Sequence, residues 1–135
     1  MDAFVRAAQR GVDVRIIMPG IPDKALVYRM SRSFYIPLLQ AGVKIYEYTP
    51  GFVHAKGCII DDEIGTMGTV NLDYRSLFLH FENNSLFYQV ALLQDLKKDF
   101  LETQAKCRER TTDNIRMNFM KWLLDGILRI LAPLC

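Results

Sequence analysis

Apolar segments of two different periods alternate along the first fifty residues, and this alternation restricts the fold more than any other feature of the chain. Residues 2–10 and 24–40 place apolar side chains at helical spacing, whereas residues 12–18 and 43–48 are short apolar runs typical of strands. Turn residues follow each segment, and Pro37 is expected to kink or break the last turns of the second helix. The order helix, strand, helix, strand predicts an α/β sandwich whose first two strands pair in parallel.

The next two strand-like runs, residues 53–60 and 64–70, are separated only by Asp61, Asp62 and Glu63, which predicts a β-hairpin. The turn lacks the Asn-Gly or Asp-Gly pair that is typical of two-residue hairpin loops, so its register is open. If Asp62 and Glu63 form a two-residue loop, the numbers of paired residues sum to 125.

The rest of the chain is expected to add one strand and two helices. Residues 85–92 form an apolar, aromatic run typical of a strand, and residues 93–110 have the pattern of a charged amphipathic helix. A last amphipathic helix is expected at about 114–131, and its apolar stripe either packs against the domain or lies in a membrane interface with Trp122 near the headgroups. Without a repeat or a long linker, residues 1–135 are expected to form one domain, a mixed β-sheet flanked by helices.

Composition excludes several classes of protein. The chain is 50% hydrophobic and 24% charged, which excludes a disordered or low-complexity chain. A net charge of +2 is too small for affinity based on bulk charge, so no nucleic-acid partner is expected. The three scattered cysteines suggest neither a disulfide framework nor a zinc site, and no metal or other cofactor is expected. No apolar run reaches the ~18–20 residues that span a bilayer, so we expect a chain that is soluble or lies on a surface.

Four polar side chains gather in the predicted hairpin. With paired numbers summing to 125, His54 lies opposite Asn71 and Lys56 lies opposite Thr69, with directly opposed Cβ atoms about 5 Å apart. Burying a histidine and a lysine on one face of an apolar strand is costly without a function. An imidazole can attack phosphorus, while an ammonium, a hydroxyl and a carboxamide can donate hydrogen bonds to the non-bridging oxygens. The pattern therefore predicts a site for a phosphate diester.

The same residues resemble a known family. The stretch from His54 to Asn71 matches H-x-K-x4-D-x6-G-[ST]-x-N, the signature of the phospholipase D superfamily. The flanking segments 10–16, 41–48 and 71–76 resemble the C-terminal half of a bacterial cardiolipin synthase, and the resemblance covers nearly the whole chain. It implies a phospholipase D-like sandwich that forms one half of a pseudo-dimer.

The resemblance also implies roles for the acid–base residues. The motif histidine, matched by His54, either attacks the diester phosphorus to give a phosphohistidine or protonates the leaving alkoxide. Glu82 stands where the family has an acid that holds the other ring nitrogen of the histidine. A carboxylate in that place would fix the tautomer of the imidazole and stabilise its charged form. The remaining histidine, His80, is interpreted as structural, as a lone histidine on a strand most often is.

The other motif residues match the phosphate-binding positions. Lys56 and Asn71 correspond to the phosphate-binding lysine and asparagine of the family, and Thr69 takes the place often held by serine. Asp61 matches the motif aspartate, which completes the candidate catalytic set, although its role is expected to be structural, through hydrogen bonds around the hairpin.

The resemblance implies an enzyme, a phosphatidyltransferase that moves a phosphatidyl group from one phosphatidylglycerol to a second and releases glycerol. A hydrolase of the same superfamily, acting on phospholipid or nucleic-acid diesters, is one alternative, and a non-catalytic half-domain is another. The expected partners are anionic phospholipid, phosphatidylglycerol in particular, and a membrane surface. The expected location is a bacterial cell membrane, with the catalytic domain on its cytoplasmic side.

The family uses two such motifs, whereas this chain contains one. We therefore expect that it is a fragment of a longer chain, completed by the N-terminal half of that parent chain, or that it pairs with a second copy. Alone, it is expected to be nearly inactive and to expose an apolar surface beside its site.

Overall fold

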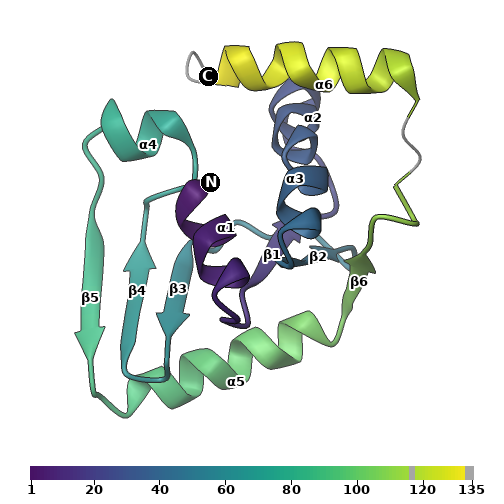
Figure 1. The fold of residues 1–135 in the computed structure, drawn as a ribbon. Coiled ribbons are helices and arrows are strands. Elements are labelled where there is room, and N and C mark those ends of the chain that lie inside the picture. Colours follow the sequence, from purple (N-terminus) through teal and green to yellow (C-terminus); the bar gives the residue numbers. More distant parts are fainter. Residues whose placement is uncertain (116–117, 133–135) are drawn as a thin grey trace. The chain divides into compact units, whose positions relative to one another are not determined.

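The structure, a computed structural model, describes residues 1–115 and 118–132 (Figure 1). Its contacts divide these residues into two compact units. Unit 1 comprises Met1–Val53 and Lys106–Ala132, and unit 2 comprises His54–Ala105. Each unit contains a three-stranded sheet accompanied by helices. The predicted α/β class is confirmed, with two small sheets where the sequence suggested one, and the expectation of a single domain stays a prediction.

The sheet of unit 1 has the strand order β1-β2-β6. Strands β1 (Arg15–Pro19) and β2 (Lys44–Tyr48) run parallel, with Arg15 opposite Lys44, which confirms the predicted parallel pair. Strand β6 (Cys107–Arg110) lies antiparallel on the other side of β2, so the sheet is mixed.

Four helices belong to unit 1. They are α1 (Asp2–Gln9), α2 (Ala25–Ser33), α3 (Tyr35–Gln40) and α6 (Phe119–Leu131). The helix predicted over 24–40 is broken at Phe34, which lies between α2 and α3. The break follows from Pro37, because proline has no N–H for the carbonyl four residues earlier and is tolerated only in the first turn of a helix. The first part of the last predicted helix includes residues 116–117, which lie outside the described residues.

The core of unit 1 forms where α3 meets β2. Tyr35, Leu38, Val43 and Ile45 are each at most 6% exposed, and partly buried side chains of α1 and β1 pack around them. Each fully buried aliphatic side chain of this kind contributes about 1.5–3 kcal/mol of transfer free energy.

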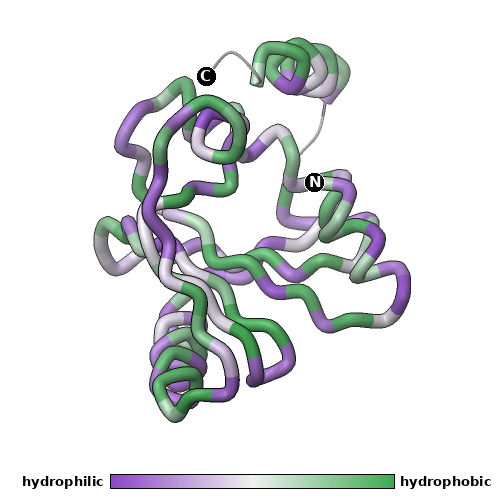
Figure 2. Tube along the Cα trace, turned by 90° about the vertical axis from the view of Figure 1, so that its left-hand side faces the viewer, coloured by the Kyte–Doolittle hydropathy of each residue, from purple (hydrophilic) through white to green (hydrophobic). Residues whose placement is uncertain are grey.

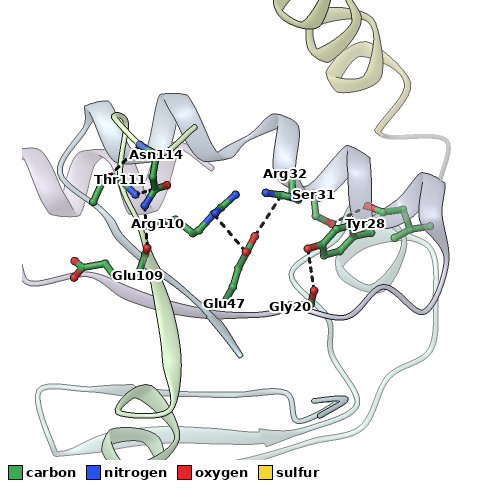
Figure 3. A network of polar contacts seen from close by, with 10 residues as sticks. Gly20, Tyr28, Ser31, Arg32, Glu47, Glu109, Arg110, Thr111 and Asn114 are labelled. Carbon is green, nitrogen blue, oxygen red and sulfur yellow. Dashed lines mark hydrogen bonds and ion pairs between the residues drawn. The ribbon is translucent and has the colours of Figure 1, made fainter. Parts of the chain in front are cut away.

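A buried carboxylate ties three elements of unit 1 together (Figure 3). The Oε1 atom of Glu47 on β2 lies 3.3 Å from Nε of Arg32 on α2, and its Oε2 atom lies 3.4 Å from Nε of Arg110 on β6. Burial, followed by the charge of Glu47, raises the pKa of the neighbouring Tyr35 hydroxyl. Removing one partner of a buried ion pair is costly, about 3–5 kcal/mol, because it leaves the other charge uncompensated.

The ion pair between Glu47 and Arg110 explains why the prediction of a helix over 93–110 is wrong at its C-terminal end. Helix α5 (Leu92–Gln104) ends early, and the last residues of the predicted helix form β6 instead. As part of β6, Arg110 is buried and reaches the carboxylate of Glu47. The charged pattern of this segment is helical by itself, but pairing with β2 and the buried carboxylate favours the strand.

Unit 2 is an antiparallel sheet of order β3-β4-β5 with two helices. Its elements are β3 (Gly57–Ile60), β4 (Ile64–Gly68), α4 (Tyr74–Phe78), β5 (Asn84–Tyr88) and α5. A Cβ atom on Gly65 would lie 2.5 Å from Cδ2 of Leu93. Glycine at this position of β4 therefore lets Leu93, a fully buried residue at the start of α5, pack directly on the strand.

The register of the hairpin differs by one residue from the prediction. Gly57 pairs with Met67, so paired numbers sum to 124 rather than 125. The loop between the paired Ile60 and Ile64 has three residues rather than the predicted two, and its first two residues, Asp61 and Asp62, have positive φ, 53° and 62°. Aspartate adopts the left-handed region more readily than glutamate, which explains the shift. The strands are also shorter than the runs 53–60 and 64–70, because regular pairing begins at Gly57.

Candidate active site

Five of the predicted site residues gather at one end of the β3-β4-β5 sheet. His54 and Lys56 precede β3, Thr69 and Asn71 follow β4, and Glu82 precedes β5. Because neighbouring strands are antiparallel, the start of β3, the end of β4 and the start of β5 lie at the same end. The residues thus lie together because they flank the strand ends. They do not form the directly opposed pairs that were predicted from residue numbers summing to 125.

Lys56 and His54 are in direct contact. The Nζ atom of Lys56 lies 3.1 Å from each ring nitrogen of His54, and it donates a hydrogen bond of 2.8 Å to the backbone carbonyl of the same residue. The side chain of His54 is exposed, so the imidazole is accessible to a ligand.

Thr69 connects the end of β4 to the segment that enters β5. Its hydroxyl donates to Oε2 of Glu82 and accepts a hydrogen bond of 3.0 Å from the backbone N–H of Asn83. A threonine hydroxyl has one O–H donor. While that donor is given to Glu82, it cannot also be given to a phosphate oxygen, so in this arrangement Thr69 orients the carboxylate.

Glu82 is held in its ionised form. The pKa of its carboxyl is lowered mainly by the hydrogen bond from Thr69, then by one from Ser76, while burial opposes the shift. The charges of His80 and Lys56 lower the pKa further. The charge of Lys56 thus reaches the carboxylate, and these residues together form the polar cluster of the site.

Asn71 is anchored by a residue that sequence reasoning missed. Its Nδ2 atom donates a hydrogen bond of 3.3 Å to Oγ of Ser76 in α4. The backbone N–H of Ser76 in turn donates to Oδ1 of Asp73 at 2.7 Å, which caps the helix. The spacing of Asp73 and Ser76 is that of an N-cap and its bonded residue, and this was the signal available in the sequence.

Gly68 lets two strands approach closely beside the site. A Cβ atom at this position would lie 2.1 Å from the backbone oxygen of Asn83 and 2.2 Å from Oδ1 of Asn84. Only glycine permits this approach, and the approach brings Thr69 against Asn83, where its backbone N–H donates to the Asn83 oxygen at 2.9 Å.

Asp61, included in the predicted catalytic set, lies elsewhere. It occupies the hairpin turn at the far end of β3 from Lys56, with a positive φ. The structure therefore does not bring it to the other five residues, and its role, expected to be structural, stays a prediction. Next to it, Asp62 pairs with Lys97 of α5.

His80, interpreted from sequence as structural, lies close to the site. Its Nδ1 atom is 4.0 Å from Oε1 of Glu82. The contacts of Glu82 described above therefore run to Thr69, Ser76 and His80, whereas the predicted support of His54 by this carboxylate stays a prediction.

The segment between Asn71 and Glu82 exposes large apolar side chains. These are Leu72, Tyr74, Leu77, Phe78, Leu79 and Phe81. Large apolar side chains are thus exposed in the segment that links two residues of the candidate site, and the expected apolar patch beside the site stays a prediction.

The described residues hold neither a cluster of metal-ligating side chains nor a membrane-spanning helix. They contain no group of three or more histidine, cysteine, aspartate or glutamate side chains placed to hold a metal ion. Their helices also include none with the length and apolar character needed to cross a bilayer.

Comparison with known proteins identifies the family. Residues 1–104 match the family model described as "Cardiolipin synthase, PLD-like domain". An uncharacterized protein of Streptococcus mutans is 50% identical over 129 residues, covering 95% of this chain and 28% of that protein. The cardiolipin synthase of Halalkalibacterium halodurans is 40% identical over 135 residues, covering 99% of this chain and 27% of the relative. The chain thus spans about a quarter of the length of these relatives.

A solved structure shares the fold. It is that of Nuc from Salmonella typhimurium, a phospholipase D family member, with a TM-score of 0.71 and 18% sequence identity over 82% of this chain and 72% of that one. The likeness supports the fold, and the family model supports the relationship. The chain therefore belongs to the family of cardiolipin synthase phospholipase D-like domains.

Proposed function

We propose that the chain is one catalytic half of a phosphatidyltransferase that makes cardiolipin and glycerol from two molecules of phosphatidylglycerol. The observation that carries the proposal is the polar cluster at the end of the β3-β4-β5 sheet, found in a member of this family. Its exposed imidazole, His54, is in contact with an ammonium, Lys56. This combination suits attack on a phosphate diester.

The reaction passes through a phosphohistidine in two balanced steps. In the first, an imidazole nitrogen forms a bond to phosphorus, the bond from phosphorus to the glycerol headgroup oxygen breaks, and the leaving glycerol takes a proton from an acid. In the second, a hydroxyl of another phosphatidylglycerol attacks phosphorus, the P–N bond breaks, and the proton of that hydroxyl returns to the same group. His54 supplies one of the two imidazoles, either as nucleophile or as acid.

Lys56 and Asn71 stabilise the charge that develops on the non-bridging oxygens. The ammonium of Lys56 already lies within hydrogen-bond distance of His54, so it can contact a diester that approaches the imidazole. Charge-assisted hydrogen bonds of this type strengthen as negative charge accumulates on the oxygens. Thr69 contributes by orienting Glu82, through the hydrogen bond that its hydroxyl donates.

The second imidazole comes from another polypeptide segment, either the N-terminal half of a longer parent chain or a second copy of this chain. The family has two motifs, whereas this chain carries one, at His54. Two groups on opposite sides of phosphorus are needed when one attacks and the other protonates the leaving oxygen.

We further propose that the protein works at a membrane surface, on the cytoplasmic side of a bacterial cell membrane. Helix α6 supports this, because it turns Asp125 and Leu128 inward, at 7% and 6% exposure, and leaves most of its other large apolar side chains exposed. The exposed set includes Phe119, Trp122 and Ile130, and Figure 2 shows how much of this helix is hydrophobic. Amphipathic helices with such a face bury it at the boundary of headgroups and acyl chains.

A chimeric enzyme tests the proposed reaction. The matching segment of the Halalkalibacterium halodurans cardiolipin synthase, 40% identical over 135 residues, is replaced by this chain. With phosphatidylglycerol vesicles, the chimera is expected to form cardiolipin and glycerol in equal amounts. Formation of phosphatidic acid alone would support the hydrolase alternative, and a folded but inactive chimera would support the non-catalytic one.

Two substitutions in the chimera test the site. Replacing His54 by alanine (His54→Ala) is expected to abolish transfer, and Lys56→Ala is expected to lower kcat by about 10²–10³. The matched control is Lys98→Ala, since the side chain of Lys98 on α5 is 76% exposed. Equal losses for Lys56→Ala and Lys98→Ala, or wild-type turnover by His54→Ala, would contradict the assignment.

A further inference from the structure

Ser76 is a buried polar residue that the proposed reaction does not use. It lies in the short helix α4 between the two site residues Asn71 and Glu82, and it is 7% exposed. Burying a hydroxyl is costly unless it is hydrogen bonded. Its partners therefore show what the position requires.

Both partners of the Ser76 side chain belong to the candidate site. Its Oγ atom accepts a hydrogen bond of 3.3 Å from Nδ2 of Asn71, and its side chain is hydrogen bonded to the carboxylate of Glu82. A serine hydroxyl has one donor and two acceptor lone pairs. An ionised carboxylate can only accept and the Asn71 amide nitrogen can only donate, so the chain of bonds has one direction, from Asn71 through Ser76 to Glu82.

The backbone of Ser76 is itself fixed. Its N–H donates to Oδ1 of Asp73 at 2.7 Å, and the backbone oxygen of Asp73 accepts from the N–H of Leu77 at 3.1 Å. The hydroxyl is therefore presented from a capped helix turn. Such a support limits the number of orientations that Asn71 and Glu82 can adopt.

We propose that Ser76 is a positioning residue of the phosphate site, one that holds the amide of Asn71 with its nitrogen in the productive orientation by coupling it to the carboxylate of Glu82. The inference rests on the proposed function, in which Asn71 donates to a phosphate oxygen. With one N–H of Asn71 directed to Ser76, the second N–H of the same NH₂ group has a fixed direction and serves the substrate.

The state of Glu82 supports this coupling. Its carboxyl receives hydrogen bonds from two hydroxyls, those of Thr69 and Ser76, and both lower its pKa. Lys56 and His80 are the charged or titratable groups that act on it from the neighbouring segments. Removing the hydroxyl of Ser76 should therefore change both the titration of Glu82 and the orientation of Asn71.

The test measures two quantities on the full 135-residue chain. NMR gives the pKa of the Glu82 carboxyl, and chemical-shift titration gives the affinity for inorganic phosphate. Ser76→Ala removes the hydroxyl, and Ser76→Cys keeps the volume with a weaker donor, which covers the case in which the alanine variant does not fold. The matched control is Ser85→Ala on β5, where the serine is exposed.

Ser76→Ala is expected to raise the pKa of Glu82 toward its ordinary value and to weaken phosphate binding by about five- to tenfold. Ser76→Cys is expected to fall between Ser76→Ala and wild type, and Ser85→Ala should match wild type. An unchanged pKa of Glu82 with unchanged phosphate affinity would overturn the inference. If the wild-type chain bound no phosphate, the proposed function would fail, while the titration of Glu82 would still decide whether Ser76 is coupled to it.

Discussion

Gly68 stands where the backbones of β4 and the segment entering β5 approach too closely for any side chain. The nearest atoms to a Cβ at this position would be backbone and side-chain atoms of Asn83 and Asn84, at 2.1 to 2.7 Å. Gly68→Ala must therefore push the two segments apart, and with them Thr69 and Glu82. We expect a loss of about 1–3 kcal/mol in the free energy of unfolding, measured by urea denaturation.

Gly126 is the matched control for this substitution. A Cβ atom there would meet nothing within 4 Å, and the residue lies inside α6. Gly126→Ala is expected to stabilise the chain by about 0.5–1 kcal/mol, because alanine favours a helix interior. Equal effects of the two substitutions would show that the close approach at Gly68 is not a constraint.

Asp13 is the residue whose ionisation is most clearly tied to the pairing of β1 and β2. Hydrogen bonds from Arg15 and Lys44 lower the pKa of its carboxyl from 3.8 to about 2, with contacts of 2.6 Å and 2.8 Å. Because the folded pKa lies below the unfolded value, the stabilisation is present above about pH 4 and is lost as the pH falls toward 2.

Asp13→Asn is therefore expected to destabilise the chain by about 0.2–0.5 kcal/mol at pH 6, a small effect because the side chain is 46% exposed. Urea denaturation between pH 6 and pH 3 measures the difference between the variant and wild type. That difference should shrink as the pH falls. A difference that is constant with pH, or equal to that of Asp99→Asn on the exposed side of α5, would contradict the assignment.

At the scale of elements, local periodicity predicted the first half of unit 1 well. Strands β1 and β2 with the intervening helices follow from apolar spacing and turn residues near one another in the sequence. The strand at Arg110 could not be predicted in this way, because its charged pattern is helical and its partner, Glu47, is distant in the sequence. Long-range pairing of a buried charge is not visible in a local pattern.

The candidate site, too, could be predicted from the sequence only in part. The spacing of His54, Lys56, Thr69 and Asn71 indicated that they meet, although the register of the hairpin was off by one residue. Ser76 was missed because α4 has only 5 residues, too few to show a period. A short helix is placed by its cap and its tertiary contacts, and of these a single sequence shows at most the cap.

Helix α6 exposes most of its large apolar side chains, and its single tryptophan reports on them. Trp122 is the only tryptophan of the chain and is exposed. It stacks on Phe119, with ring centroids 6.1 Å apart. If α6 lies in a membrane interface, Trp122 moves to a less polar environment when vesicles are added.

We therefore expect a blue shift of tryptophan fluorescence with phosphatidylglycerol vesicles, and co-sedimentation of the chain with them. Ile130→Gln, at the exposed face of α6, should weaken binding by about three- to tenfold, since it removes buried apolar area. Ile60→Gln, at an exposed position of β3, is the control and should bind as wild type. Equal binding by both variants would show that α6 is not the membrane contact.

At the scale of the whole molecule, the chain carries one motif histidine, His54, and the lysine and asparagine that match the phosphate-binding positions of the family. Diester transfer through phosphohistidine needs a nucleophile and an acid on opposite sides of phosphorus. The chain also spans about a quarter of the length of its relatives. Under the proposed function, these two observations separate phosphate binding from turnover, since the chain has the residues proposed to hold a phosphate but one of the two imidazoles proposed to transfer it.

The isolated chain is therefore expected to bind inorganic phosphate but to form no cardiolipin from phosphatidylglycerol vesicles. Adding the remaining N-terminal portion of the Halalkalibacterium halodurans enzyme as a separate polypeptide should restore transfer, and His54→Ala should prevent the restoration. If a second copy supplies the missing imidazole instead, activity will rise with the square of the chain concentration, and light scattering will show a dimer. Full activity of a monomer, at a rate proportional to its concentration, would show that one motif histidine is sufficient and that the two-imidazole mechanism is wrong for this protein.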